Sequence, residues 1–269
     1  MTIGNYPDIN VTLDDYVATV TIQRPPHNFF DYNLICAIAD AFEDLDKNPD
    51  CRAIVLTAEG KSFCAGANFG GDDAIDKKED NDPEDNAFKK RSGRLYSEAV
   101  RLFRAKKPVV CAVQGAAIGG GLGLALVGDF RVACPEARFS ANFSRLGFHP
   151  GFGLTHTLPA LIGQQKAHLM FYTGRRIKAE QAAEWGLVDM LVSREELLPS
   201  AKRLAREIAG SAPLAVQSIR ETVRQGLGDR VQAATDRELQ EQEWLLKTDD
   251  AKEGIKATAE RREPSFAAK

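Results

Sequence analysis

The stretch that decides the fold is residues 114–123, which read Q-G-A-A-I-G-G-G-L-G. It directly follows residues 109–113, a short apolar run rich in β-branched side chains that is typical of a buried strand. Small residues let a ligand approach the backbone closely. Because the glycines lead into an apolar helical stretch, we expect free backbone N–H groups at the start of that helix. The stretch fits either a tight packing turn or a site that binds partial negative charge.

A second turn of small residues lies at 61–68 and reads K-S-F-C-A-G-A-N. It also follows a predicted buried strand, at residues 52–57. Two N–H groups aimed from two such turns at one point would form an oxyanion hole. A phosphate-binding loop is the third option, but neither the full G-x-x-x-x-G-K-[ST] motif nor G-x-G-x-x-G occurs at these turns.

The predicted elements around the two turns alternate between strand and helix, which indicates an α/β architecture. Residues 70–91 are rich in charged residues and predict a mobile surface segment leading into a helix. The last third is helical, and its amphipathic helices have too little core to stand alone. We expect strands at 9–13, 17–22, 52–57, 109–113, 130–133 and 138–140, and helices at 33–47, 86–105, 122–127, 230–247 and 250–261. A further helix opens at the capping box of residues 193–196 and stops at Gly210, and Pro213 fits the first turn of the next one.

The overall composition excludes several classes of protein. A net charge of −3 gives no general attraction to nucleic acid or to an anionic membrane. The five cysteines are scattered without a C-x-x-C pair, which argues against a disulfide framework or a zinc site and favours a reducing compartment. The first fifteen residues show no secretory signal, and the longest apolar stretch is too short to cross a bilayer. We expect a cytoplasmic protein.

The two turns resemble motifs of the crotonase (enoyl-CoA hydratase/isomerase) superfamily. Residues 61–68 are similar to its F-x-A-G-A-D motif, and residues 114–121 to its N-G-x-x-x-G-G-G motif. Near the end of the chain, T-D-D-A-K-E-G at 248–254 matches T-D-D-x-x-E-G. The resemblance covers nearly the whole chain in order. Further similar segments are 129–133, 146–151, 172–176, 183–188 and 260–262.

The resemblance implies a spiral of repeated ββα turns over residues 1–200, followed by a helical oligomerisation region at 201–269. It implies an acyl-CoA thioester as substrate, with coenzyme A as the substrate carrier and no prosthetic group or metal. It also implies a homo-trimer, or a hexamer built as a dimer of trimers. Neither nucleic acid nor membrane is an expected partner.

The resemblance also assigns roles to individual residues. Ala65 and Gly120 would supply the two oxyanion-hole N–H groups. Residues 65–68 (Ala65, Gly66, Ala67 and Asn68) would line the path of the thioester and pantetheine. Arg261 stands where the family has a lysine that reaches a coenzyme A phosphate.

The chain departs from the family at three carboxylate positions. Hydratases use two glutamates, and the corresponding residues here are Gly123 and Phe143. Some isomerases keep a carboxylate in the P-x-x-G turn, where this chain has Gly151. General acid–base groups contribute roughly 10²–10⁴-fold to rate, so their loss weakens the hydratase interpretation. Phe143 and Gly151 are expected to line the acyl pocket, Phe143 as an apolar wall.

Other groups could replace the missing carboxylates. His149 could act as base, as acid or as the group that orients water. It could instead be a packed structural histidine. Cys64, beside Ala65, is a weaker candidate for a nucleophile. Further candidates are the lid residues Asp72, Asp73, Glu79 and Tyr96, and the basic residues Lys89, Lys90, Arg91 and Arg94, which could meet coenzyme A phosphates or face solvent.

Three functions remain open from the sequence. The leading one is an acyl-CoA enzyme of the hydratase/isomerase type that stabilises a thioester enolate. The second is C–C bond hydrolysis, decarboxylation or thioester hydrolysis on the same scaffold, with His149 contributing. The third is an acyl-CoA-binding protein without catalytic activity.

Overall fold

The computed structural model describes residues 2–68 and 87–269, with the side chains of residues 87–91 excepted. The expectations for the charged segment at 70–86 therefore lie outside the described residues, as do those for Asp72, Asp73 and Glu79. The same holds for the side chains of Lys89, Lys90 and Arg91. Among the described residues, no helix is both long and apolar enough to span a lipid bilayer.

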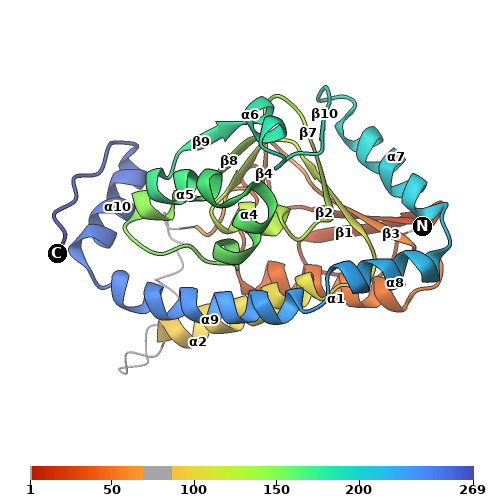
Figure 1. Ribbon diagram of the computed structural model, residues 1–269, viewed down its shortest axis with the longest axis horizontal. Helices are drawn as coiled ribbons and strands as arrows, with labels where there is room; N and C mark the ends of the chain where they lie inside the picture. The colour runs from red at the N-terminus through yellow and green to blue at the C-terminus, as the bar shows by residue number, and fades with distance from the viewer. Residues whose placement is uncertain (1, 69–86) are drawn as a thin grey trace.

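Two sheets form the centre of the molecule (Figure 1). In the first, the antiparallel hairpin β1–β2 leads into parallel strands, in the order β1-β2-β3-β5-β7-β10. Its strands are β1 (Ile9–Asp14), β2 (Val17–Ile22), β3 (Ala53–Ala58), β5 (Val109–Val113), β7 (Phe130–Ala133) and β10 (Met190–Leu191). The second has the order β4-β6-β8-β9, with strands β4 (Ser62–Cys64), β6 (Ala116–Ile118), β8 (Arg138–Ser140) and β9 (Arg176–Lys178).

The chain alternates between these sheets in a regular way. A strand of the first sheet is followed by a strand of the second, and a helix then leads back, as in β3-β4-α2 and β5-β6-α3. This is the spiral of ββα turns, so the expected α/β fold is confirmed. The helices are α1 (Tyr32–Lys47), α2 (Ala87–Phe103), α3 (Gly120–Ala125), η1 (Asn142–Leu146), α4 (Leu154–Ile162), α5 (Gln164–Thr173), α6 (Ala179–Glu184), α7 (Leu197–Ala209), α8 (Pro213–Val223), α9 (Leu227–Leu245) and α10 (Asp249–Glu260).

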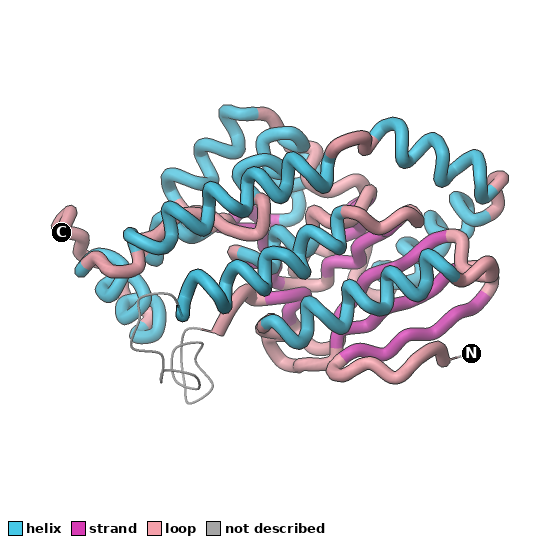
Figure 2. Tube along the Cα trace, turned by 90° about the horizontal axis from the view of Figure 1, so that it is seen from below, coloured by secondary structure: helices cyan, strands magenta, loops and turns pink. Residues whose placement is uncertain are grey.

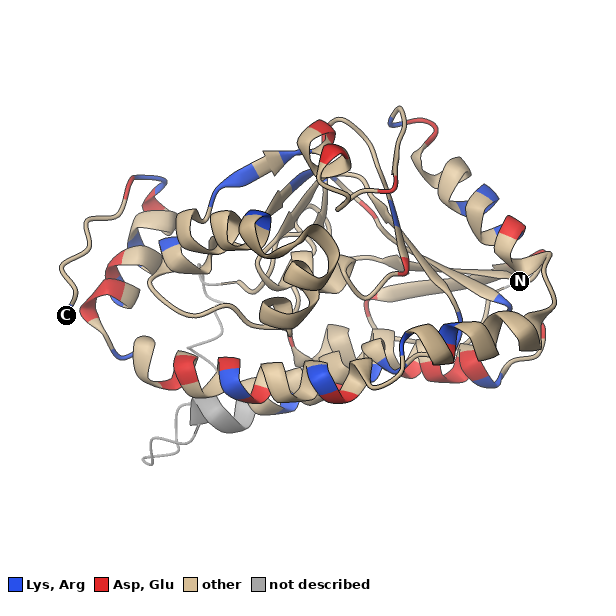
Figure 3. Ribbon diagram, viewed as in Figure 1, with Lys and Arg blue, Asp and Glu red and all other residues tan. Residues whose placement is uncertain are grey.

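The first sheet is covered on both faces, which explains why its inner strands are apolar without alternation. On one face, Val55 and Val110 pack against Ala201 and Ala205 of α7. On the other, buried residues such as Leu56 belong to the main core, which also contains the apolar faces of α1 and α2. Figure 3 shows few charged residues on these central strands and many on α9 and α10.

The C-terminal helices are anchored to the core by polar contacts. Arg220 and Arg224 both bind the carboxylate of Asp129, which directly precedes β7, at 2.9 and 2.6 Å. Helix α9 runs alongside α2 (Figure 2), and the Tyr96 hydroxyl of α2 donates to Gln242 Oε1 of α9 at 2.8 Å. The predicted division at residue 200 falls inside α7, a helix that packs on the first sheet.

Candidate functional site

The pairing of β4 with β6 brings the two small-residue turns together. These strands are parallel neighbours, with Ser62 opposite Ala116 and Cys64 opposite Ala117, so both turns leave the same edge of the sheet. The approach is close: a Cβ atom added at Gly66 would lie 2.8 Å from the carbonyl oxygen of Ile118 and 3.9 Å from the Gly120 nitrogen. Gly66 also has φ +86°, a conformation that glycine adopts without steric cost.

The N–H group of Gly120 is available to a ligand. Helix α3 begins at Gly120, and its first turn is closed by bonds from the nitrogens of Leu122 and Gly123 to the carbonyl of Gly119. Gly119 itself donates to the Ser140 carbonyl at 2.8 Å. No hydrogen bond from the Gly120 N–H is found in the part of the chain that the structure describes. The role expected for Gly120 requires such a free N–H.

The N–H group of Ala65 is not available, and this expectation needs correction. It donates to the carbonyl of His27 at 3.0 Å. The peptide between Gly66 and Ala67 is oriented differently, because the Gly66 carbonyl accepts from the Phe30 N–H at 3.0 Å. In a trans peptide the C=O and the following N–H point in opposite directions, so the N–H of Ala67 points away from Phe30. The Ala67 N–H makes no hydrogen bond to the residues that the structure describes.

Asn28 holds this segment in register. Its side chain is fully buried, and its amide group donates to the carbonyls of Glu59 and Ser62, both at 2.7 Å. Its Oδ1 accepts from the backbone N–H of Arg24 at 3.0 Å. These bonds tie the segment that carries His27 and Phe30 to the start of β4, so Ala65 and Gly66 meet their partners at fixed positions.

Aromatic rings occupy the space at two of the three positions where this chain lacks the family's carboxylate. A Cβ atom added at Gly123 would lie 2.7 Å from Phe152 Cδ1, so the ring fills the place of a side chain there. Phe143, at the second glutamate position, is 7% exposed and makes an edge contact with Phe148 at 5.8 Å between ring centroids. A Cβ atom at Gly119 would lie 3.6 Å from Phe143 Cζ.

The third carboxylate position is covered by Tyr96 and Gln242. A Cβ atom added at Gly151 would lie 2.9 Å from Tyr96 Cζ and 2.7 Å from Gln242 Nε2. Burial and the nearby Glu238 carboxylate raise the pKa of Tyr96, so its hydroxyl stays protonated and donates to Gln242. Gln242 Nε2 in turn donates to the carbonyls of His149 and Pro150, at 3.0 and 3.2 Å.

Glu238 is a buried carboxylate that holds the same turn. It is fully buried and accepts from the N–H groups of Gly153 and Thr155 and from the Thr155 hydroxyl, at 2.8, 2.9 and 2.6 Å. Burial raises its pKa, although these three donors act in the opposite direction. Glu238 and Gln242 lie one turn apart on α9, so this helix positions the whole turn from His149 to Thr155.

The remaining candidates are placed as follows. His149 is half-buried, and its Nδ1 lies 3.0 Å from the Pro150 carbonyl oxygen. Cys64 is fully buried and its pKa is raised to about 12 by burial, so it is a neutral thiol and a poor nucleophile. Arg261 is exposed at the C-terminus of α10, with φ +57°. Asn68 is half-buried at the end of the described segment.

Sequence reasoning missed Phe30, Phe152, Glu238 and Gln242. A bulky residue between two glycines at 151–153 was the one available signal for Phe152. The polar residues of α9 gave none, since they belong to an ordinary amphipathic pattern. Among the described residues, no group of three or more His, Cys, Asp or Glu side chains is placed to hold a metal ion.

Comparison with known proteins places these features in context. The family model described as enoyl-CoA hydratase/isomerase matches residues 12–269. The chain is 33% identical over 267 residues to a crotonyl-CoA hydratase of Syntrophomonas wolfei, covering 98% of this chain and 99% of the relative. It is 32% identical over 255 residues to a 1,2-epoxyphenylacetyl-CoA isomerase of Escherichia coli, covering 94% and 95%. A solved enoyl-CoA hydratase/isomerase of Pseudoalteromonas atlantica superposes with a TM-score of 0.84 at 30% identity, covering 97% and 100%.

Replacing Glu238 with Gln should destabilise the protein by about 1–3 kcal/mol at pH 7, because an amide cannot accept from all three donors. The pH dependence should also change. A carboxyl group whose pKa is raised in the folded state contributes less to stability as the pH rises from the group's ordinary pKa through its raised pKa. Glutamine does not titrate, so the variant lacks this pH dependence. Urea unfolding between pH 4.5 and 8 measures both. Glu221→Gln, at an exposed residue of α8, is the control. Equal free energies of unfolding for wild type and Glu238→Gln would contradict this account.

Proposed function

We propose, given that this chain belongs to the enoyl-CoA hydratase/isomerase family, that it binds an acyl-CoA thioester and stabilises the enolate form of the acyl group. The observation that carries the proposal is the free N–H of Gly120 beside the turn that carries the free N–H of Ala67. The thioester carbonyl oxygen would accept from both groups. We assign the second donor to Ala67 because Ala65 is bonded to His27.

The chemistry follows from where charge develops. Removal of a proton from the carbon next to a thioester carbonyl moves negative charge onto the carbonyl oxygen. Donors that already point at this oxygen stabilise the transition state more than the ground state, and each is worth roughly 10²–10³ in rate. Ala67 forms a bridge with Phe30, and Gly120 opens α3 directly after β6, so backbone pairing holds both N–H groups in place before a ligand binds.

The remainder of the thioester would follow the backbone of residues 65–68. Gly66 supports this route, since its missing side chain leaves the backbone of β6 open to close approach. Arg261 is exposed and carries a positive charge suited to a coenzyme A phosphate. The neighbouring Arg262 is already paired with Glu253 and Glu260, which leaves Arg261 as the better candidate of the two.

We propose proton transfer at the acyl group, and not water addition, as the reaction. Water addition needs groups that activate and deliver water, and the positions expected for them hold Gly123 and Phe143. The space beside Gly123 is filled by Phe152, which leaves no room there for a polar side chain. A relative at 32% identity is a 1,2-epoxyphenylacetyl-CoA isomerase, so the family contains isomerases as well as hydratases.

Removing the Gly120 donor tests the oxyanion hole. Gly120→Pro lacks the N–H, and proline is tolerated at the first position of a helix. Gly120→Ala keeps the N–H and adds the same Cβ atom near the Phe30 ring, so it is the matched control. Enolate formation is measured as uptake of deuterium from D₂O at the α-carbon of butyryl-CoA and phenylacetyl-CoA, by mass spectrometry. We expect exchange in Gly120→Pro to be about 100-fold or more slower than in Gly120→Ala. Similar rates in the two variants would rule out this role for Gly120.

His149 is our candidate for the group that moves the proton. The Pro150 carbonyl can only accept, so its contact with Nδ1 favours the tautomer that carries hydrogen on Nδ1. Nε2 is then free to accept a proton. We expect His149→Ala to slow deuterium exchange at least tenfold, while the dissociation constant of butyryl-CoA changes little. His168→Ala, at a half-buried position on α5 where the ring stacks on Tyr172, is the control. Unchanged exchange in His149→Ala would remove the histidine from the mechanism.

The other functions predict different products. C–C bond hydrolysis, decarboxylation or thioester hydrolysis would change the mass of the thioester, whereas proton transfer in H₂O does not. A protein that only binds acyl-CoA would show tight binding and no deuterium exchange. Mass spectrometry of a panel of thioesters, read together with the exchange assay, separates these outcomes.

We also propose assembly into trimers through the helical region. Helix α8 carries Leu214, Ile219 and Val223 with exposed fractions of 79%, 63% and 75%, and Trp244 of α9 is 55% exposed. Large apolar side chains exposed in this number on neighbouring helices are typical of an interface between subunits. Sedimentation velocity at micromolar concentration should give a trimer or a hexamer, and Ile219→Asp should shift the distribution towards monomer. A monomeric wild type would contradict this assembly.

A further inference from the structure

Gln242 is a buried amide whose hydrogen bonds connect α2 and α9 to the turn that carries His149. It is 3% exposed, and its Nε2 donates to the carbonyls of His149 and Pro150 at 3.0 and 3.2 Å. Its Oε1 accepts from the hydroxyl of Tyr96 in α2 at 2.8 Å. The amide group therefore donates on one side and accepts on the other, and the Tyr96 hydroxyl keeps its NH₂ group turned towards the two carbonyls.

The Pro150 carbonyl connects this amide group with the His149 ring. Its oxygen lies 3.2 Å from Gln242 Nε2 and 3.0 Å from His149 Nδ1. A carbonyl oxygen has two lone pairs and can only accept, so both contacts are favourable only when both nitrogens carry hydrogen. The arrangement favours the tautomer of His149 with hydrogen on Nδ1, whereas an unconstrained neutral histidine in water carries it mostly on Nε2. The carbonyl must be held in place to overcome that preference.

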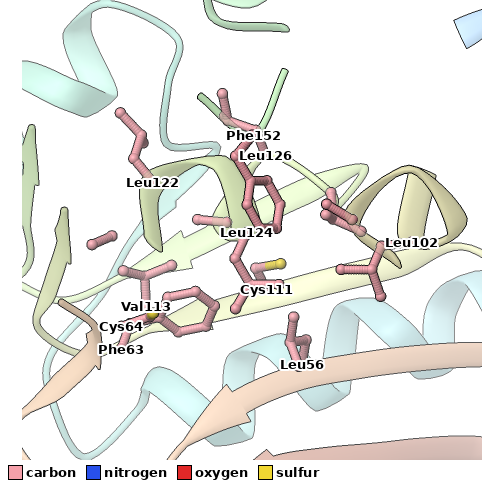
Figure 4. Packing of buried hydrophobic residues seen from close by; sticks show 14 of the residues in the cluster. Leu56, Phe63, Cys64, Leu102, Cys111, Val113, Leu122, Leu124, Leu126 and Phe152 are labelled. Carbon is pink, nitrogen blue, oxygen red and sulfur yellow. The ribbon is translucent and has the colours of Figure 1, made fainter. Parts of the chain in front are cut away.

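The turn at residues 149–155 carries backbone strain and is held from outside. Phe152 and Gly153 have φ of +64° and +72°, in the left-handed region that a residue with a Cβ atom adopts at a cost. Strain of this kind persists only where the surroundings compensate for it. Here the Phe152 side chain is anchored in the main core (Figure 4), while Glu238 and Gln242 bind the two ends of the turn. The position of the carbonyls in this turn therefore depends on α9.

We propose that Gln242 and Tyr96 are positioning residues for His149. They fix the Pro150 carbonyl, which holds hydrogen on Nδ1 and leaves the lone pair of Nε2 free for the proton that leaves the acyl α-carbon. A histidine held in the wrong tautomer loses much of its catalytic effect, so these two residues influence the rate without touching the substrate. The catalytic step rests on the proposed function, whereas the tautomer of His149 can be measured without a substrate.

The first measurement reads the tautomer of His149 from the ¹⁵N chemical shifts of its ring, because a ring nitrogen that carries hydrogen and one that does not differ widely in shift. The protein is labelled with ¹⁵N-histidine and studied in alkaline buffer, and the His149 signals are those absent from His149→Ala. We expect hydrogen on Nδ1 in wild type. In Tyr96→Phe and Gln242→Leu the hydrogen should shift towards Nε2. Tyr6→Phe is the matched control, since it removes a hydroxyl that donates to Asp44 of α1 at 3.0 Å.

The second measurement follows deuterium uptake at the α-carbon of butyryl-CoA in a double-mutant cycle. Tyr96→Phe should slow uptake about tenfold when His149 is present, a fraction of the contribution of a general base. In the His149→Ala background it should slow uptake less than about twofold, because a residue that acts only through the histidine has no further effect there. Tyr6→Phe should leave uptake unchanged in both backgrounds.

Hydrogen on Nε2 in wild type, or the same tautomer in wild type and Tyr96→Phe, would overturn the positioning role. Slowing of uptake by the same factor in both backgrounds would also overturn it, because Tyr96 would then only support the fold. Tyr96→Phe removes a single oxygen atom, so it decides the question even if Gln242→Leu does not fold. If wild type takes up no deuterium, the proposed function fails, and the tautomer alone then decides whether Gln242 and Tyr96 position the histidine.

Discussion

The pairing of β4 with β6 is the constraint on which the site depends. Two backbones approach so closely here that side chains are excluded at several points. A Cβ atom at Gly115 would lie 2.9 Å from the carbonyl carbon of Lys61, and one at Gly121 would lie 2.7 Å from that of Cys64. The glycines are thus required by packing as well as by function. The packing interpretation and the oxyanion interpretation of these turns describe the same geometry, because close strands present the N–H of Gly120 and that of Ala67 from adjacent strand ends.

A second level of organisation comes from α9, which lies far from the turns in sequence. Its residues Glu238 and Gln242 bind backbone groups of residues 149–155, and Gln242 also accepts from Tyr96 of α2. Burying a carboxylate and an amide is costly unless their hydrogen bonds are made, and here they are made to one turn. The C-terminal helices therefore do more than cover the core, since they position the turn that carries His149 and Phe152.

The resulting site combines a polar backbone with apolar walls. In the proposed mechanism the N–H groups of Gly120 and Ala67 stabilise charge on one oxygen, and the buried rings of Phe30, Phe143 and Phe152 lie beside the glycines at 119–123. Electrostatic stabilisation is stronger in such surroundings than in water. A site of this kind suits a reaction in which charge moves within the substrate. It suits poorly a reaction in which water must be held and activated.

The sequence by itself indicated an α/β architecture and the two small-residue turns, because strand periodicity and glycine spacing are local properties, and the resemblance of its motifs implied the family and its spiral. Only the tertiary structure decided which N–H is free. Ala65 and Ala67 are the same residue type two positions apart, and the orientation of the peptide at Gly66 makes one a partner of His27 and leaves the other open. Likewise Gly123 shows that a carboxylate is missing, but not that Phe152 fills its place. Such facts depend on contacts between segments distant in sequence, and no local pattern records them.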